Sequence, residues 1–442
     1  MLHGPLFMKI IVFALPLAAS SLMQQLFNSV DVAVVGRFAS NQALAAVGSN
    51  GPVISLLINL FVGVSMGANV IISNHIGQND RDSIRKAIDT VALVALVSGI
   101  VLMLIGVAAA KPILTLMGTP ADVLPLAITY LRIYFLGIPF FLVFNFGAAI
   151  LRSMGDTRRP LYILLIAGIA NTLLNLFFVI VLGMSVEGVA IATGIANIIS
   201  AALIVRLLLN ESEPYRLHIR QMGITWNELK RMLAIGIPAG LQGMVFSFSN
   251  VLLQTAINSH GADAIAGSAA AINFEYYCYF VISAFVGTAI SFIGQNYGAG
   301  NKKRVIRVFW ICMALGGAGC CLLNELFVWQ HDFFLSLFTA DPNVQAYGYE
   351  RMQTVLAWQF IACSYEISAA ALRGMGRSMQ PTVIIIFGTC VLRVLWVYTV
   401  CPVHDTFGTI MLVYPISWCI TGIMVGTAMF RFARKTLCVN EI

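Results

Sequence analysis

The sequence predicts an all-α membrane protein with twelve transmembrane helices in two parallel, pseudo-symmetric lobes of six helices each. Hydrophobic residues make up 59% of the 442 residues and charged residues 10%, against roughly 45–50% and roughly 25% in soluble domains. Mean hydropathy is +0.87. The apolar runs are continuous, whereas the strands of a membrane barrel would alternate apolar and polar residues over about ten positions. These observations exclude a water-soluble enzyme and favour membrane-spanning helices.

Twelve apolar segments are long enough for a membrane span, which needs about 20 residues. They are expected near residues 10–36, 43–74, 87–110, 122–150, 160–182, 188–209, 231–258, 263–296, 305–328, 345–371, 381–402 and 408–430. The first follows Lys9 and is longer than the apolar core of a typical signal peptide, and it lacks a convincing small-residue cleavage site. We therefore expect it to be a retained first helix.

The longest polar interruption divides the chain into halves. It runs from Asn210 to Lys230, between the sixth and seventh expected helices. The sequence thus predicts an N-lobe over residues 1–210, a cytoplasmic linker over 211–230 and a C-lobe over 231–442.

Lys and Arg residues gather on one side of this arrangement. The side that holds both termini carries 21 of the 26 Lys and Arg residues, and the exceptions are Arg37, Lys111, Arg132, Arg351 and Arg393. Cytoplasmic loops are enriched in these residue types, so both termini are expected in the cytoplasm. The short loops fit a multi-pass protein of a prokaryotic plasma (inner) membrane. The net charge of +7 then reflects topology and contact with membrane lipids, not nucleic-acid binding.

The two halves repeat one another. Residues 149–160 (AILRSMGDTRRP) match residues 370–381 (AALRGMGRSMQP) at six of twelve positions with a shift of 221. Pro16 and Pro238 align at 222, one gap away. Because each repeat has an even number of helices, the two lobes have the same orientation in the membrane. Parallel repeats are typical of transporters with a central site between two lobes.

A polar stripe in the first helix marks a candidate ion site. Ser21, Gln24, Asn28 and Asp31 are spaced three or four residues apart and share one helical face. Later helices of the same half supply three further polar side chains, Asn171, Asn175 and Thr193. One carboxylate with several amide and hydroxyl oxygens suits a hard cation such as Na⁺. The carboxylate would equally serve as a proton carrier. A third interpretation is a structural hydrogen-bond network that only packs the helices together.

The second half carries different charges within its spans. Glu275 lies among aromatic residues (NFEYYCYF) that include Tyr276, and such surroundings suit a lipophilic cation. Glu366 and Arg393 lie in neighbouring expected helices, where they contact substrate or neutralise each other as a structural ion pair.

The sequence lacks the motifs of several classes of pump and enzyme. There is no GxxxxGK[ST] loop, no HExxH and no GxSxG, so neither a nucleotide-driven pump nor a metalloprotease or serine hydrolase is expected. Most of the nine cysteines fall inside apolar runs and are expected to be small buried residues. The sequence predicts no enzyme, no cofactor and no metal beyond a Na⁺ at Asp31.

Four motifs together resemble the multidrug and toxic compound extrusion (MATE) family over the whole chain. They are N28-S-V-D31-x4-G36, the paired LR[SG]MG segments, GQNYGAG at 294–300 and YPISW at 414–418. The resemblance implies a two-lobed exporter that expels cationic amphiphilic drugs and dyes by alternating access, driven by Na⁺ or H⁺. The family's N-lobe ion site falls on Asp31, Asn171, Asn175 and Thr193. Many relatives have Asp where this chain has Asn175, which leaves one carboxylate and should weaken ion affinity.

The expected function is therefore a cation-coupled antiporter for organic cations. Ion handling is assigned to the first half at Asp31, Asn171, Asn175 and Thr193. Substrate contacts are assigned to Gln24, Asn28, Glu275, Tyr276, Glu366 and Arg393. The alternatives on the same fold are a flippase for a lipid-linked precursor, which would need a cavity lined by Arg and Lys, and an exporter of an endogenous metabolite. A monomer is expected.

Overall fold

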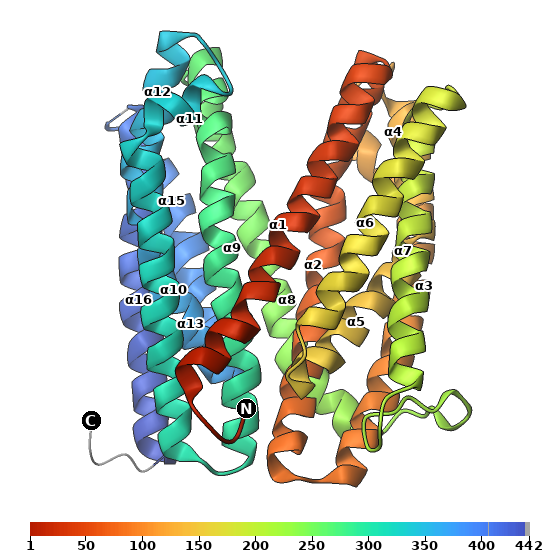
Figure 1. Cartoon of the computed structure of the whole chain (residues 1–442). Coiled ribbons are helices and arrows are strands. Elements are labelled where there is room, and N and C mark those ends of the chain that lie inside the picture. Colours follow the sequence, from red (N-terminus) through yellow and green to blue (C-terminus); the bar gives the residue numbers. More distant parts are fainter. Residues whose placement is uncertain (405, 438–442) are drawn as a thin grey trace. The chain divides into compact units, whose positions relative to one another are not determined.

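The computed structural model describes residues 1–404 and 406–437, and every regular element in this part of the chain is helical (Figure 1). Positions 405 and 438–442 of the predicted C-lobe lie outside the described residues. The first half contains α1 (Leu6–Phe38), α2 (Asn41–Gln78), α3 (Arg81–Leu116), α4 (Leu124–Leu136), α5 (Ile138–Met154), α6 (Arg158–Leu176), η1 (Phe177–Val181) and α7 (Val186–Leu209). The second half contains η2 (Ile219–Gln221), α8 (Trp226–Asn258), α9 (Ala262–Gly298), α10 (Lys302–Trp329), α11 (His331–Ser336), α12 (Pro342–Thr354), η3 (Leu356–Ile361), α13 (Ala362–Gly374), α14 (Met379–Ile385), η4 (Ile386–Val391), α15 (Leu392–Thr399) and α16 (Phe407–Leu437).

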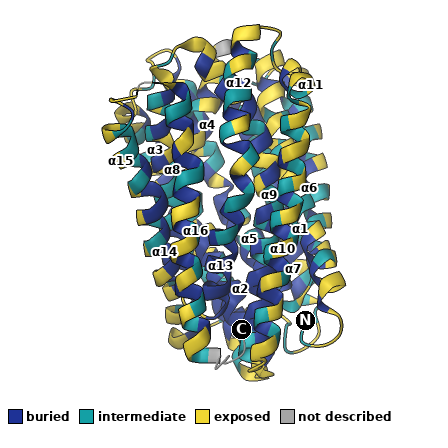
Figure 2. Cartoon of the chain, turned by 90° about the vertical axis from the view of Figure 1, so that its left-hand side faces the viewer, coloured by how far each residue is buried: buried dark blue, intermediate teal, exposed yellow. Residues whose placement is uncertain are grey.

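The helices match the twelve expected spans. Among the described residues, eleven helices are long and apolar enough to cross a membrane, or twelve when the bent pair α4–α5 counts as one span. Many of their exposed residues are large and apolar, such as Leu173, Leu322 and Ile423. Figure 2 shows buried and exposed residues alternating along individual helices. One face of such a helix packs against protein, and an apolar exposed face suits lipid.

The fourth span of each repeat is interrupted at an equivalent place. In the first half the chain bends by 45° between α4 and α5, around Gly137. Pro139 follows at the start of α5, where its missing N–H leaves the helical ladder incomplete. In the second half the short 3₁₀ segment η3 interrupts the corresponding helix about 221 residues later. The sequence pattern predicts each of these spans but not its interruption.

The described chain forms two compact units whose limits fall inside helices. One unit is Ala19–Gly240, and the other combines Met1–Ala18 with Leu241–Ile442. Each limit lies inside α1 or α8, two residues after Pro16 or Pro238. These units differ from the N-lobe, linker and C-lobe expected from the sequence. The expected boundary at residues 211–230 stays a prediction about where one sequence repeat ends and the next begins.

The first residues of the chain are built into the second of these units. Phe13 meets Phe292 of α9 edge-to-face, with ring centroids 5.4 Å apart. The Arg304 guanidinium at the start of α10 donates hydrogen bonds to the carbonyl oxygens of Met1 (3.1 Å) and Gly4 (2.9 Å). The segment before Ala18 is therefore held by both apolar and polar contacts.

Small residues let α8 approach α2 closely within the unit Ala19–Gly240. Gly63 and Gly67 on α2 face Gly236 and Gly240 on α8, and each pair is spaced by four residues. This spacing places small residues on one helical face and allows backbones to touch. Near the start of α8 the ring of His75 contacts the Glu228 carboxylate at 2.8 Å (Nε2 to Oε2), and both side chains are buried.

Replacing Gly236 by Ala is expected to destabilise the protein by about 1–3 kcal/mol, the usual range for overfilling a packed contact. The added Cβ would lie 2.4 Å from Cα of Val64 and 2.9 Å from O of Gly63, and these backbone atoms cannot turn aside. Thermal inactivation of the purified protein in detergent measures the change. Gly194→Ala is the matched control, because no atom lies within 4 Å of a Cβ at that position. Equal inactivation midpoints for the two variants would contradict this packing argument.

Candidate functional site

The structure brings Asp31, Asn171, Asn175 and Thr193 together in the unit Ala19–Gly240. Asn175 Nδ2 donates hydrogen bonds to Asp31 Oδ1 and to Asn171 Oδ1, the latter at 3.3 Å. Asn171 Nδ2 in turn donates to Thr193 Oγ1 at 3.4 Å. The side chains of α1, α6 and α7 thus form one hydrogen-bonded group, which we call the Asp31 cluster. Its residues are the four that the sequence proposes for ion handling.

Local packing explains how these helices meet. A Cβ at Gly168 of α6 would lie 1.8 Å from the ring of Phe27, so only a glycine lets α1 approach here. Asn171 and Asn175 follow one and two turns later on α6. The π-helical segment η1 begins at Phe177, directly after α6. Segments of this kind are frequent at functional sites because they leave backbone groups and side chains in unusual positions.

The Asp31 cluster offers oxygen ligands to a small cation. Asn175 is fully buried, and its Oδ1 accepts no hydrogen bond within the described chain. The cluster also supplies the Asp31 carboxylate and the Thr193 hydroxyl. This hydroxyl donates to the carbonyl oxygen of Val189 (3.0 Å) and accepts from Asn171, which leaves one lone pair for a cation. Oxygen-only ligation with a single carboxylate fits a monovalent hard cation or a proton. Among the described residues, no group of three or more His, Cys, Asp or Glu side chains could hold a metal ion.

Two tyrosines near the Asp31 cluster are absent from the sequence-based site. Tyr130 and Tyr134 of α4 both lie close enough to Asp31 for an electrostatic interaction with its carboxylate. Their rings stack with centroids 6.1 Å apart. They are one helical turn apart, and that i, i+4 spacing was the available signal. Tyrosines are common in apolar helices, so their presence in α4 does not by itself indicate a site.

In the second half, Glu275 has a buried cationic partner. Arg351 of α12 is 1% exposed and contacts Glu275 in a bidentate pair, Nε to Oε1 at 2.5 Å and Nη2 to Oε2 at 2.9 Å. Arg351 Nη1 also donates to Ser268 Oγ at 2.7 Å. In the sequence, Arg351 stands out only as one of the five Lys and Arg residues that do not fall on the cytoplasmic side. Its pairing with Glu275 is not predicted there. The Glu275 charge is therefore largely compensated, which removes much of the reason for assigning it to an organic cation.

Glu366 and Arg393 do not neutralise each other. No ion pair joins them in the part of the chain that the structure describes, so the structural-pair alternative is wrong. Arg393 lies over the rings of Tyr414 (4.5 Å) and Phe246 (5.1 Å). Its guanidinium donates to Ser417 Oγ at 3.3 Å and to Asn250 Oδ1 at 3.3 Å. The aromatic and polar groups of α8 and α16 hold Arg393, and Glu366 accepts a hydrogen bond from Tyr279 (3.5 Å).

The remaining predicted substrate residues lie on exposed faces of their units. Gln24 and Asn28 are exposed on α1 and Tyr276 is 46% exposed on α9. Exposure leaves them accessible to a ligand, and their role in binding stays a prediction.

A single protein-family description covers most of the chain. The family model described as MatE matches residues 16–177 and again residues 238–399. The chain belongs to the MatE family. Because the second match begins 222 residues after the first, the internal repeat inferred from the sequence is confirmed. Membership of this family confirms the prediction of a multi-pass membrane transporter rather than an enzyme.

Known relatives and solved structures agree with this MatE assignment. The chain is 28% identical over 390 residues to the "Probable multidrug resistance protein YoeA" of Bacillus subtilis, covering 85% of this chain and 82% of that protein. It is 24% identical over 429 residues to the "FAD transporter" of Shewanella oneidensis, covering 92% and 90%. The "Crystal structure of MATE in complex with MaD3S" has a TM-score of 0.90 at 22% identity, covering 99% of this chain and 98% of that one. The structural likeness confirms the all-helical fold predicted from the sequence.

Proposed function

We propose that this MatE protein is a cation-coupled antiporter that exports cationic amphiphilic compounds by alternating access. The observation that carries the proposal is the Asp31 cluster, in which a carboxylate in a membrane-spanning helix faces a buried amide with an unsatisfied oxygen. An ionisable group within a span is costly and therefore marks an ion or proton pathway. The similarity to a protein named as a probable multidrug resistance protein supports the drug-export reading.

The Asn175 amide gives the Asp31 cluster two alternative arrangements. When Asp31 is ionised, it accepts a hydrogen bond from Asn175 Nδ2, as in the structure. When Asp31 carries a proton, its hydroxyl donates instead, and half a turn of the amide presents Oδ1 as the acceptor. A bound Na⁺ would favour the same turned amide, because Oδ1 then joins the carboxylate as a ligand. Either coupling ion neutralises the single negative charge of the cluster and changes how α1 is held to α6.

Coupling requires that the ion and the substrate favour different states of the protein. A ligand shifts a conformational equilibrium only by the difference in its affinity for the two states. Because Asn171 and Thr193 extend the cluster to α6 and α7, ion binding alters contacts of α1 with both helices. We propose that this change drives release of the exported compound on the outer side of the membrane.

The proposed orientation follows from the charge pattern. The side with 21 of the 26 Lys and Arg residues is assigned to the cytoplasm, together with both termini and the linker 211–230. We further propose that the protein is a monomer in the plasma membrane of a prokaryote, with an N-lobe over residues 1–210 and a C-lobe over 231–442.

An exporter of an anionic or zwitterionic metabolite is the second candidate function. Arg393 is 1% exposed, its guanidinium has no acidic partner in the described chain, and its Nη2 forms no hydrogen bond there. A buried cation of this kind favours a substrate with a negative group. The similarity to a protein named as an FAD transporter points the same way. With Glu275 compensated by Arg351, Glu366 stays a candidate for contact with an exported organic cation.

Replacing Asn175 by Asp tests the role of the Asp31 cluster. A second carboxylate beside Asp31 is expected to lower the Na⁺ concentration for half-maximal ethidium efflux by at least ~tenfold, because a nearby charge contributes more than about 1.4 kcal/mol at a buried site. Efflux is measured in cells without their own pumps, after a Na⁺ pulse and separately after an acid pulse. Asn145→Asp is the matched control, since it adds a carboxylate to the same unit, on α5, in place of an amide that donates only to Phe141 O. An active Asn175→Asp variant with unchanged responses to both pulses would contradict the assignment.

A further inference from the structure

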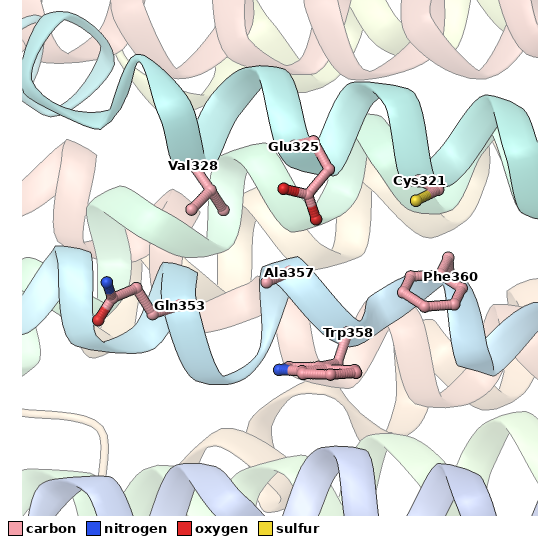
Figure 3. A pocket seen from close by; sticks show the side chains of 7 residues that line it. All are labelled: Cys321, Glu325, Val328, Gln353, Ala357, Trp358 and Phe360. Carbon is pink, nitrogen blue, oxygen red and sulfur yellow. The ribbon is translucent and has the colours of Figure 1, made fainter.

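A groove lies between α10 and the α12–η3 segment of the unit that includes Leu241–Ile442. Its volume is about 500 Å³, within the usual range for a small-molecule site. One wall is formed by α10 and the other by α12 and η3, as Figure 3 shows. The side chains used below are Cys321, Glu325, Gln353, Trp358 and Phe360.

The α10 wall carries an acid on an apolar helix face. Figure 3 shows the Glu325 carboxylate directed from α10 into the groove. Its neighbours Leu322 and Leu326 are 73% and 44% exposed, which is expected of a helix face in lipid. Within the described chain Glu325 forms no ion pair and no hydrogen bond. An acid in such surroundings needs a partner, and the protein supplies none here.

The opposite wall offers groups that complement a cationic headgroup. The Trp358 indole is 51% exposed and Phe360 lies beside it, so aromatic rings border the groove next to Glu325. Aromatic faces attract ammonium groups, and Trp does so most strongly. The exposed Gln353 amide can donate a hydrogen bond to an anionic oxygen.

The α10 wall of the groove reaches the depth of lipid headgroups. Glu325 is four residues before the last residue of α10, Trp329, which is about 6 Å along the helix axis. The helix has 28 residues, about 42 Å, whereas the hydrocarbon core is about 30 Å thick. Glu325 therefore lies near the edge of the hydrocarbon, and Cys321 and Phe360 mark the deeper end of the groove. Trp329 is the last residue of α10 and 77% exposed, and exposed tryptophans are typical of this interfacial region.

We propose that this groove binds the headgroup of an aminophospholipid, phosphatidylethanolamine. The ammonium N–H groups donate to the Glu325 carboxylate and lie over the Trp358 indole. The Gln353 amide donates to the phosphodiester, and the acyl chains continue along the apolar face of α10. A lipid is favoured over a soluble amine because the groove adjoins exposed leucines that face the bilayer, where lipid is always present. This site is independent of the proposed export activity.

Native mass spectrometry of the purified full-length protein in detergent tests the proposal. Phosphatidylethanolamine and phosphatidylglycerol with identical acyl chains are titrated against wild type and Glu325→Gln. Wild type is expected to retain phosphatidylethanolamine at least ~tenfold better than Glu325→Gln, the loss of one charge-assisted contact. Retention of phosphatidylglycerol should be the same in both proteins. Asp332→Asn is the matched control, because Asp332 is an exposed acid of α11 that does not line the groove.

The aromatic wall and the source of the ammonium group need separate tests. Trp358→Leu keeps an apolar side chain but removes the indole, and it is expected to reduce phosphatidylethanolamine retention several-fold. Equal retention by wild type and Glu325→Gln, or equal retention of the two lipids by wild type, would overturn the proposal. Binding of dodecylammonium that depends on Glu325, without such binding of phosphatidylethanolamine, would also overturn it in favour of a single-chain cation. Unchanged thermal inactivation of Glu325→Gln establishes that the variant is folded.

Discussion

Replacing Asp31 by Asn is expected to reduce ethidium efflux to the level of cells that lack the protein. Asp31 supplies the one carboxylate of the cluster it forms with Asn171, Asn175 and Thr193. Without it the cluster is electrically neutral in every state, so neither a proton nor Na⁺ can be bound and released as the coupling charge. The amide that replaces the carboxylate has similar size and retains a hydrogen bond to Asn175, so folding should be preserved. Efflux after a Na⁺ pulse and after an acid pulse measures both coupling routes.

Two further variants show whether this loss is specific. Asp122→Asn removes an exposed acid of the same unit and is expected to leave efflux unchanged. Asp31→Glu keeps the charge and should retain part of the activity. Full efflux by Asp31→Asn at normal membrane abundance would contradict the coupling role. If wild type itself extrudes no dye although it reaches the membrane, the drug-export proposal fails and metabolite cargo, favoured by Arg393, becomes the better candidate.

Replacing Arg351 by Met is expected to destabilise the protein by about 3–5 kcal/mol, the usual cost of removing one partner from a buried ion pair. The change leaves Glu275 as an uncompensated charge and also removes the hydrogen bond to Ser268. The side chain of Met occupies similar space, so the loss is electrostatic rather than a cavity effect. Thermal inactivation in detergent, compared with that of wild type, measures it.

The double variant Glu275→Gln/Arg351→Met distinguishes a paired charge from simple packing. Since both charges are then absent, it is expected to recover most of the stability lost by Arg351→Met alone. Arg307→Met, on an exposed face of α10, is the control and should have little effect. Additive losses in the double variant would show that Glu275 and Arg351 are not coupled. Unchanged substrate selectivity in Glu275→Gln would agree with a structural rather than a selective role for this acid.

Most of the fold is predictable from the sequence because burial in a bilayer imposes a simple rule. Every span must be long and apolar, so α1, α9 or α16 stand out from the polar segments between them. The bend at Gly137 is not visible in hydropathy, since both of its sides are apolar. It depends on a local break in the helical ladder beside Pro139 and on how α4 and α5 pack.

The candidate site was predictable in its members but not in its pairings. Asp31 and Asn175 stand out as polar residues in apolar helices, which is a signal of composition alone. That Asn175 donates to Asp31 depends on the close approach that Gly168 allows, and this is tertiary information. Arg351 was overlooked for a similar reason. It lies in the polar helix α12, and its burial results from packing against α9, where a Cβ at Gly267 would lie 2.4 Å from the carbonyl oxygen of Val344.

The contacts of the first residues with α9 and α10 have a consequence for the synthesis and membrane insertion of the protein. Phe13 leaves the ribosome 279 residues before Phe292, its partner in the structure. At ~5–20 residues per second this interval is roughly 15–55 s. The beginning of α1 therefore enters the bilayer before its packing partners exist. Lipid covers its packing surface until α9 and α10 have been inserted. A nascent chain that stops before α9 has an unfinished second unit even when all seven preceding spans have inserted.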